Sequence, residues 1–176
     1  MSKVLVVVDM QTDFINGALG SADAEKIVPR AAEIIANFDG EIYCTLDTHG
    51  EDYLKTQEGR NLPVAHCIKG TDGWLIDKRI AAALSGKARF VEKPSFGSPE
   101  LAHMLAEKNK QEKIESIEVI GLCTDICVVS NALIIKAALP EVKIIVDASA
   151  CAGISPESHQ AALKTMQMCQ IEVLNG

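Results

Sequence analysis

The segment from Gly121 to Val129, GLCTDICVV, contains the side chain best suited to covalent chemistry. Its pattern predicts a buried strand, a tight turn and an apolar helix, with Cys127 in the first turn of that helix. Free backbone N–H groups and the positive end of the helix dipole lower the pKa of a thiol there and favour the thiolate. The same N–H groups can form an oxyanion hole for acyl transfer. We therefore expect Cys127 to be a nucleophile; core packing, or pairing with Cys123 in a redox or metal site, is the alternative.

A nucleophilic thiol needs one group that takes its proton and another that holds the thiolate. Asp9 follows the first apolar run and suits a general base that later protonates the leaving group. Lys93 follows a later β-rich run and suits a cation that holds both charges. The four histidines lie away from the ends of these other strands, so a Cys–His pair is not expected. For either charge taken alone, a solvated loop position or a structural ion pair is the better explanation.

The stretch from Asp47 to Gly73 has no clear periodicity, and a loop of that length in a compact domain is usually functional. It contains Asp47, His49, Glu58 and His66. Carboxylate and imidazole groups together suit zinc, iron or manganese, and sites with open positions are the catalytic type. Asp47 and His49 are two residues apart and point the same way if a strand extends that far. These residues are candidate ligands for one divalent metal ion, but a histidine in a loop, taken alone, is more often a surface residue.

Short β-rich runs alternate with longer helical patterns, which is typical of a parallel sheet flanked by helices. The predicted strands are Lys3–Val8, Glu41–Leu46, Ala88–Glu92, Ser116–Gly121, Val142–Asp147 and Glu172–Leu174. The predicted helices are Ala24–Phe38, Ile76–Ser85, Pro99–Lys110, Asp125–Leu139 and Pro156–Cys169. We expect an α/β fold, a three-layer α/β/α arrangement with a mainly parallel, roughly six-stranded Rossmann-like sheet, in one domain over residues 1–176. Ligands bind beyond the carboxyl ends of such strands, where these reactive residues, and Asp147 after the fifth strand, would gather.

Composition argues against several classes of protein. The chain has 17 basic and 24 acidic residues, a net charge of −7 and no basic run, so no nucleic-acid partner is expected. No apolar run approaches the roughly 20 residues that span a bilayer, so no membrane partner is expected. The first apolar run ends in an aspartate and lacks a small-residue cleavage site, which predicts a cytoplasmic protein without export. In that reducing setting the six cysteines favour burial, metal binding or catalysis over disulfides.

From the first strand to the last, the chain resembles the nicotinamidase/isochorismatase-like family of cysteine hydrolases. The stretch Asp9–Phe14, DMQTDF, resembles the opening aspartate motif of that family. The stretch Gly121–Val128 resembles its GxxTDxCV nucleophile motif, which is the most specific signal in the sequence. The resemblance implies a catalytic triad of Asp9, Lys93 and Cys127. It also implies a cis peptide bond between Leu122 and Cys123, and an oxyanion hole formed by the N–H groups of Cys123 and Cys127.

The long loop is similar to that of nicotinamidases, which have an aspartate, a histidine two residues later and a second histidine in a proline-preceded segment. Here that segment is Leu62–Thr71, LPVAHCIKGT. Some members use a glutamate as the remaining ligand, which points to Glu58, with Glu51 and Asp52 as competitors. In nicotinamidases the metal holds the pyridine nitrogen of the substrate while the amide faces the cysteine. The metal-ligand set Asp47, His49, Glu58 and His66 therefore favours a nicotinamidase.

A flat ring requires an aromatic wall in the substrate pocket. Phe14 matches the family position, and Phe96 or Trp74 would supply a second face, with core packing as the alternative for Trp74.

The resulting hypothesis is an amidohydrolase that cleaves a small-molecule amide, nicotinamide to nicotinate and ammonia, through a thioester on Cys127. The first alternative is another amide, carbamoyl or isochorismatase-type hydrolase on the same scaffold. An alternative from another class is a zinc-binding or redox thiol protein that uses Cys123, Cys127 and Cys151, and a third is a non-catalytic interaction domain. Family members often form dimers or tetramers, so the resemblance is compatible with a homo-oligomer.

Overall fold

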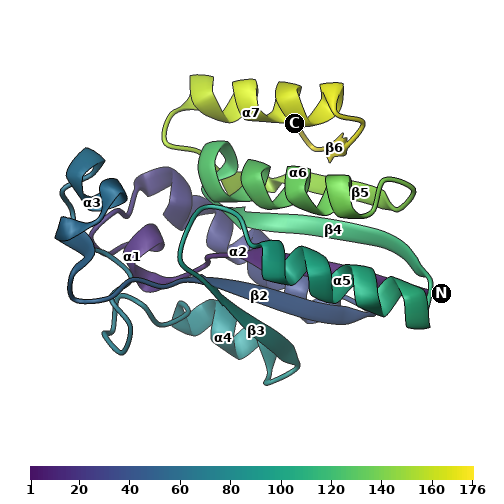
Figure 1. Cartoon of the computed structure of the whole chain (residues 1–176), viewed down its shortest axis with the longest axis horizontal. Coiled ribbons are helices and arrows are strands. Elements are labelled where there is room, and N and C mark those ends of the chain that lie inside the picture. Colours follow the sequence, from purple (N-terminus) through teal and green to yellow (C-terminus); the bar gives the residue numbers. More distant parts are fainter.

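The computed structural model describes residues 1–176 and has one six-stranded sheet between two layers of helices (Figure 1). All strand pairs are parallel, in the order β3-β2-β1-β4-β5-β6. The strands are β1 (Ser2–Val8), β2 (Glu41–Asp47), β3 (Ala88–Lys93), β4 (Ile114–Leu122), β5 (Lys143–Ala152) and β6 (Glu172–Leu174). The predicted α/β class and six-stranded sheet are confirmed, and the sheet is entirely rather than mainly parallel.

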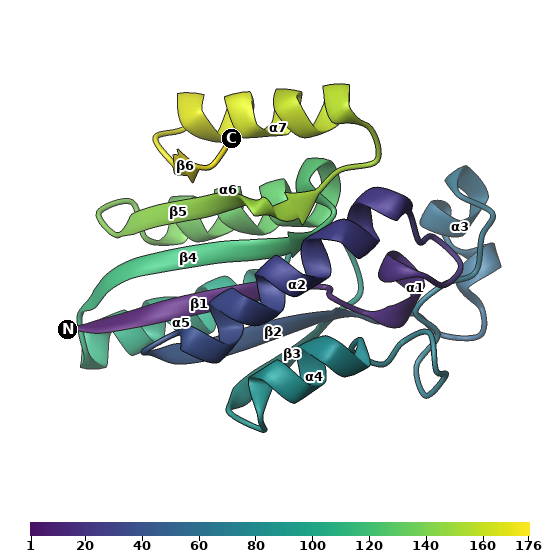
Figure 2. The ribbon, with the colours of Figure 1, turned by 180° about the vertical axis from the view of Figure 1, so that it is seen from behind.

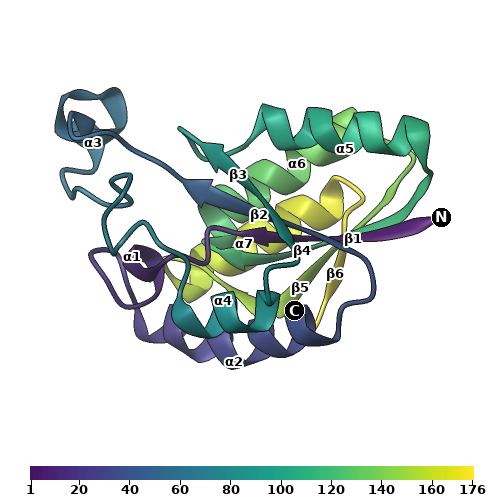
Figure 3. The ribbon, with the colours of Figure 1, turned by 90° about the horizontal axis from the view of Figure 1, so that it is seen from below.

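Seven α-helices accompany the sheet. They are α1 (Thr12–Ile15), α2 (Ala22–Asn37), α3 (Gln57–Asn61), α4 (Lys78–Leu84), α5 (Pro99–Gln111), α6 (Val129–Ala138) and α7 (Pro156–Met168). In Figure 3 the sheet is seen nearly edge-on, with α2 and α4 on one side and α5 and α6 on the other. Side-chain caps fix where several helices begin: the Ser21 and Ser98 hydroxyls accept the N–H groups of Ala24 and Leu101. None of the helices has both the length and the apolar character that crossing a bilayer needs.

The hydrophobic core is divided in two by the sheet, and the sequence of β1 shows why. Its apolar run is buried on both faces, because successive side chains of a strand point to opposite sides. Val4, Val6 and Val8 belong to a cluster with α5, α6 and α7, whereas Leu5 and Val7 belong to a cluster with α1, α2 and α4. Both layers therefore hold β1 rigidly, and Asp9, which follows it, leaves the sheet at a fixed position.

The strand predictions differ most from the structure at β5. This strand does not end at Asp147 but continues to Ala152, where Gly121 pairs with Cys151 and Leu122 with Ala152 after a break in register. The extension consists of small residues without β-branched side chains, so propensity gave no signal, and pairing with β4 decides the conformation. The prediction that Asp147 follows the strand is therefore wrong. Its carboxylate accepts hydrogen bonds from Ser149, Asn175 and Arg30 instead.

The long segment between β2 and α4 is less irregular than predicted. It contains a 3-10 turn at Tyr53–Lys55 and the short helix α3, and the segment after β1 contains α1, none of which was predicted. Helices this short have no amphipathic period to read, and the surrounding contacts stabilise them. Figure 2 shows α1 and α3 together at the end of the molecule opposite to the N-terminus. Both lie beyond the carboxyl ends of the central strands.

Candidate active site

The structure brings Asp9, Lys93 and Cys127 together. Asp9 directly follows β1, Lys93 is the last residue of β3, and Cys127 lies in a π-helical turn, Thr124–Val128, between β4 and α6. The Lys93 ammonium lies 2.6 Å from Asp9 Oδ2 and 3.5 Å from Cys127 Sγ. The side chains of Asp9 and Lys93 have no exposed surface, and Cys127 is 5% exposed. Three residues that are distant in the sequence therefore form one buried acid–cation–thiol cluster.

Hydrogen bonds from the neighbouring strands hold the two charged members of this cluster. The Thr45 hydroxyl donates to Asp9 Oδ1 at 2.6 Å and accepts the Asp9 N–H at 3.2 Å. The Lys93 ammonium donates to the Ser95 carbonyl at 2.9 Å and to Asp47 Oδ1 at 3.2 Å. Asp9 therefore has one oxygen fixed by Thr45 and the other directed at Lys93, so its carboxylate has a single orientation.

Burial dominates the electrostatics of the thiol. It raises the pKa of Cys127 well above the usual value; the Asp9 charge adds to this effect, and Lys93 opposes it. The helix N-terminus led us to expect a lowered pKa, and burial of the thiol gives the opposite direction. Burial also raises the pKa of Asp9, against the opposing charge of Lys93. Burial lowers the pKa of Lys93, but Asp9, Cys127 and Asp47 together raise it by a larger amount. The pKa is therefore above its usual value, and the ammonium stays charged.

The turn that carries Cys127 is fixed by close packing and by a hydrogen bond to the segment that precedes α7. Gly121 has φ +122°, and a Cβ atom there would lie 2.1 Å from the Val8 carbonyl oxygen, so only glycine fits. The Leu122–Cys123 peptide bond is cis, as the family resemblance implied. The Asp125 carboxylate accepts the Ile154 N–H at 2.9 Å. These contacts fix the backbone that presents the thiol.

A second cluster, of metal-ligand type, lies beside the first. One oxygen or nitrogen atom from each of Asp47, His49, Glu58 and His66 falls within 4.8 Å of all the others. His49 Nε2 lies 3.0 Å from Asp47 Oδ2 and 3.6 Å from Glu58 Oε1. His66 Nε2 lies 3.5 Å from Asp47 Oδ2 and 3.8 Å from Glu58 Oε1. Ligands about 2 Å from a tetrahedral ion lie about 3.3 Å apart, so the donor set fits a divalent metal ion.

The structure separates Glu58 from its two competitors. Glu58 lies in α3 and is directed into the cluster, whereas Glu51 and Asp52 are exposed and outside it. His66 Nδ1 hydrogen-bonds to the Val64 carbonyl at 2.8 Å, which leaves Nε2 facing the other ligands, as is usual for histidines that bind metals. The structure therefore favours Glu58 as the fourth member.

Asp47 connects the two clusters. Its Oδ1 atom accepts a hydrogen bond from Lys93, while Oδ2 faces His49 and His66. Burial raises the pKa of Asp47, but hydrogen bonds from His49 and His66 together with the Lys93 charge outweigh it and hold the pKa below the usual value. The carboxylate is ionised, and each oxygen faces one of the two clusters.

A cavity of about 390 Å³ opens onto both clusters and is mostly apolar. Eleven residues line it: Phe14, Leu19, Asp47, Glu58, Leu62, His66, Phe96, Cys123, Ile126, Cys127 and Ile154. Phe14 and Phe96, which were predicted to contact the substrate, are among them. Trp74 is not; its indole N–H donates to Thr48 Oγ1 at 2.9 Å, and its ring packs against the core. The aliphatic members were not predicted, because leucine and isoleucine carry no signal that separates a pocket wall from a core.

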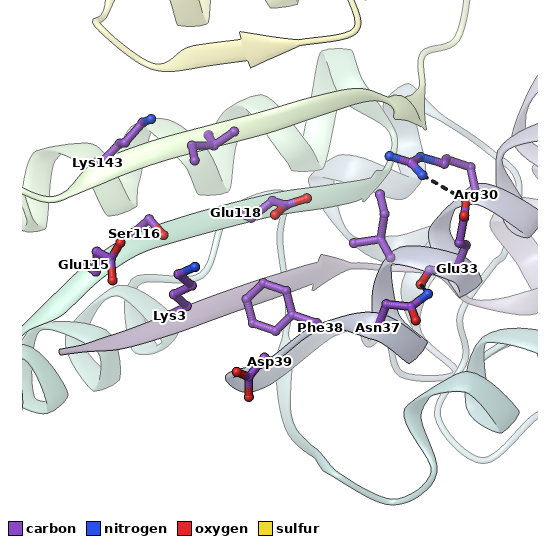
Figure 4. A pocket seen from close by; sticks show the side chains of 12 residues that line it. Lys3, Arg30, Glu33, Asn37, Phe38, Asp39, Glu115, Ser116, Glu118 and Lys143 are labelled. Atoms are coloured by element: carbon purple, nitrogen blue, oxygen red, sulfur yellow. Dashed lines mark hydrogen bonds and ion pairs between the residues drawn. The ribbon is translucent and has the colours of Figure 1, made fainter.

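A larger hollow of about 660 Å³ lies elsewhere, between α2 and strands β1, β4 and β5 (Figure 4). Its lining is mainly charged and includes Lys3, Glu118 and Lys143. It contains no cysteine, no histidine and none of the predicted site residues. This groove is the larger of the two, but the smaller cavity contains the reactive side chains. We therefore place the candidate active site in the smaller cavity.

Comparison with known proteins finds matches along almost the whole chain. The isochorismatase domain model matches residues 3–175. A nicotinamidase of Bacillus subtilis superposes with a TM-score of 0.83 at 26% identity, over 99% of this chain and 100% of that one. A Pyrococcus horikoshii pyrazinamidase in complex with zinc gives 0.81 at 27% identity, over the whole of both chains. N-carbamoylsarcosine amidase of Thermoplasma acidophilum gives 0.78 at 27% identity, over 99% and 96% of the two chains.

Proposed function

The chain belongs to the isochorismatase family, and from this premise we propose that it is an amidohydrolase that converts nicotinamide to nicotinate and ammonia. The observation that carries the proposal is that one apolar cavity is lined both by the Cys127 thiol and by three members of the metal-ligand cluster, Asp47, Glu58 and His66. A flat ring carboxamide has its reactive carbonyl at one end and its ring nitrogen at another, and this cavity offers a partner for each. Residues 1–176 would act as one catalytic domain.

In the proposed reaction Asp9 accepts the proton of Cys127, and the thiolate attacks the amide carbonyl carbon to form a C–S bond. The N–H groups of Cys123 and Cys127 would hold the resulting oxyanion. Asp9 then passes its proton to the nitrogen, the C–N bond breaks, and ammonia leaves. A water molecule attacks the thioester while Asp9 takes its proton, and the C–S bond breaks to give the acid and the restored thiol. Lys93 stabilises the Asp9 and Cys127 charges throughout.

The raised pKa values of Asp9 and Cys127 support this assignment of roles. A thiol that keeps its proton in the resting protein needs a base in contact with it, and a carboxylate whose pKa is raised by burial is a better base than an exposed one. The Lys93 ammonium holds the two groups in place without itself donating a proton, because its own pKa is raised. Protons therefore move only among Asp9, Cys127, the substrate and the attacking water.

Asp47, His49, Glu58 and His66 would hold a divalent metal ion such as zinc, iron or manganese. A bound ion would supply a Lewis-acidic position for the ring nitrogen of the substrate. The zinc-containing pyrazinamidase structure supports this proposal, as does the fit of the donor distances to tetrahedral coordination. No cysteine belongs to this cluster, which argues against the alternative of a zinc protein with thiolate ligands.

The similarity to N-carbamoylsarcosine amidase makes a carbamoyl substrate the second candidate. Such a substrate carries a carboxylate, which a binding site normally pairs with arginine or lysine. The cavity lining contains neither of these residues. Isochorismate, which carries two carboxylates, is disfavoured for the same reason. The chemistry of the lining favours a neutral, flat amide.

The test is ammonia release from nicotinamide by the purified protein, with N-carbamoylsarcosine and isochorismate as competing substrates and the Cys127→Ala variant as control. We expect turnover of nicotinamide by the wild type alone. Turnover of N-carbamoylsarcosine without turnover of nicotinamide would overturn the substrate and retain the mechanism. Turnover of nicotinamide by Cys127→Ala would overturn the mechanism.

A further inference from the structure

Gln11 lies two residues after Asp9, is fully buried, and has no part in the reaction proposed above. Its carboxamide is nonetheless fully engaged with main-chain groups on two other segments. Oε1 accepts the Asp47 N–H at 2.8 Å, and Nε2 donates to the Asp47 carbonyl at 2.9 Å and to the Trp74 carbonyl at 2.8 Å. The side chain of Gln11 therefore holds both polar main-chain groups of the first metal-ligand residue.

Asp13 makes an equivalent contact at the other end of the metal-ligand segment. Its Oδ2 atom accepts the N–H of Cys67, the residue directly after His66, at 2.8 Å, and its Oδ1 atom accepts the Ala18 N–H at 3.1 Å. Gly73 packs against this carboxylate so closely that a Cβ atom there would lie 2.2 Å from Asp13 Oδ2. The Asp13 N–H also donates to the Gly73 carbonyl at 3.0 Å. The approach is specific to glycine, so the carboxylate sits in a close-fitting position.

The two contacts hold the metal-ligand segment from outside, at its first and last ligands. Within the segment, the His49 N–H donates to the Cys67 carbonyl at 3.0 Å, and the Lys69 N–H donates to the His49 carbonyl at 2.9 Å. These bonds tie His49 to the stretch directly after His66, and Gln11 and Asp13 fasten Asp47 and Cys67 to the segment that follows β1. Figure 2 shows α1, which begins just after Gln11, beside the loop that contains α3.

We propose that Gln11 and Asp13 are positioning residues that set the affinity of the cluster Asp47, His49, Glu58 and His66 for a divalent metal ion. The inference rests on the metal site of the proposed function and extends it to two residues that contribute no metal ligand. Metal ligands must lie within a few tenths of an ångström of their required positions. Freeing the backbone at Asp47 or beside His66 therefore raises the free-energy cost of bringing the ligands together around the ion. Loss of an outer contact of a metal ligand typically weakens affinity about 10- to 100-fold.

The chain provides a closely matched control for Gln11. Asn131 is also fully buried, and its carboxamide makes the same three kinds of bond: it accepts the Ser98 N–H at 3.0 Å and donates to the carbonyls of Cys127 and Phe96 at 2.8 and 3.1 Å. None of these groups belongs to a residue of the metal cluster. Replacing Gln11 or Asn131 by an apolar residue of similar size removes the same number of hydrogen bonds, but only the first replacement frees a metal ligand.

The experiment measures the zinc dissociation constant of the full chain by competition with a chromophoric chelator, together with the melting temperature of the metal-free protein. Gln11→Met is compared with Asn131→Leu. We expect both variants to melt at a lower temperature, and the zinc affinity to fall about tenfold or more in Gln11→Met alone. Equal zinc affinity in Gln11→Met and the wild type, or an equal loss in Asn131→Leu, would overturn the proposal.

A second pair of variants serves if Gln11→Met does not fold. Asp13→Asn loses one of its two acceptor oxygens, and Asp147→Asn is its control, because Asp147 also accepts a backbone N–H, that of Ser149, at 3.0 Å. We expect weaker zinc binding in Asp13→Asn and unchanged binding in Asp147→Asn; equal affinity in both would overturn the role of Asp13. A wild-type protein that binds no zinc, iron or manganese would instead show that the proposed metal site is wrong, and this inference with it.

Discussion

The cavity beside Cys127 and the groove of Figure 4 differ in how far the charged side chains near them are exposed to water. The groove holds more charged side chains, but most of them are open to water: the side chains of Arg30 and Lys143 are 42% and 56% exposed. The charges next to the cavity, on Asp9 and Lys93, have no exposed surface. Water screens the first group and cannot reach the second, so an equal charge acts more strongly at the cavity.

Two properties distinguish the reactive region from the groove: its charged side chains are buried, and one of them contacts a thiol. At the groove, Glu33 pairs with Arg30, and Glu172 pairs with Lys143, in exposed ion pairs of a kind that contributes little to stability. Next to the cavity, the Lys93 ammonium contacts both the Asp9 carboxylate and the Cys127 thiol. Burial and these neighbouring groups shift the pKa of all three. Such mutual perturbation is characteristic of groups that exchange protons.

The largest effect should come from removing the thiol. We predict that Cys127→Ala lowers kcat/KM for nicotinamide at least about 10⁴-fold, because it removes the sulfur that attacks the amide in the proposed reaction. The metal content of the variant should equal that of the wild type, since Cys127 is not a member of the metal-ligand cluster. Steady-state ammonia release and elemental analysis check both statements. Activity within tenfold of the wild type, or loss of metal from the variant, would contradict them.

Removal of the metal should have the next largest effect. We predict that chelation lowers kcat/KM for nicotinamide about tenfold or more and that zinc, iron or manganese restores it. Binding should also stabilise the fold, by about 2.7 kcal/mol at a metal concentration 100 times the dissociation constant. Activity and thermal melting of the metal-free and reloaded protein provide the measurements. A metal-free protein with full activity and an unchanged melting temperature would remove the metal from the account.

A smaller effect is expected from Thr45→Val. The Thr45 hydroxyl donates to Asp9 Oδ1 and so favours the ionised carboxylate. Without this bond the pKa of Asp9 rises further, so activity, which needs the ionised form, is lost at a higher pH as the solution is acidified. The pH profile of kcat/KM reports this shift in the free protein. Thr45→Ser, which keeps a donor, should leave the acid limb near its wild-type position. An unmoved limb in Thr45→Val, or one that moves to lower pH, would show that Thr45 does not act on Asp9.

The smallest effect is predicted in the groove. Burial raises the pKa of Glu118, and no partner bonds to its carboxylate, so Glu118→Gln removes an unpaired charge. We expect the activity to change less than twofold and the free energy of unfolding to change by no more than about 0.5 kcal/mol. Kinetics and urea unfolding of this variant check the expectation. A severalfold loss of activity with unchanged stability would assign the groove a role in the reaction and weaken the contrast with the cavity.

Much of the fold follows from sequence pattern, because buried parallel strands such as β1 are continuous apolar runs. The positions of Asp9, Lys93 and Cys127 follow from the same pattern, since each lies at the carboxyl end of a recognisable strand. Short elements were not predictable: α3, which carries Glu58, has no periodicity. The resemblance to a family, and not the pattern, singled out Glu58.

The contacts that orient the site could not be read from the sequence. Gln11 bonds to a residue 36 positions away, and Asp13 to one 54 positions away, so their partners are defined only once the fold brings them together. Trp74 was predicted to contact the substrate because it is an aromatic residue near the expected rim of the site. Its indole N–H bonds to Thr48 instead. The raised pKa of Cys127 depends on burial, which the helix-dipole reasoning did not include.

The most direct test of the proposed mechanism is to trap the thioester. The protein is mixed with nicotinamide, quenched in acid during turnover, and digested for mass spectrometry. The account predicts one added nicotinoyl group, located on the peptide that contains Cys127 and absent from a sample quenched without substrate. A nicotinoyl group on another residue, or turnover with no covalent adduct at the earliest measurable times and undiminished hydrolysis by Cys127→Ala, would contradict it.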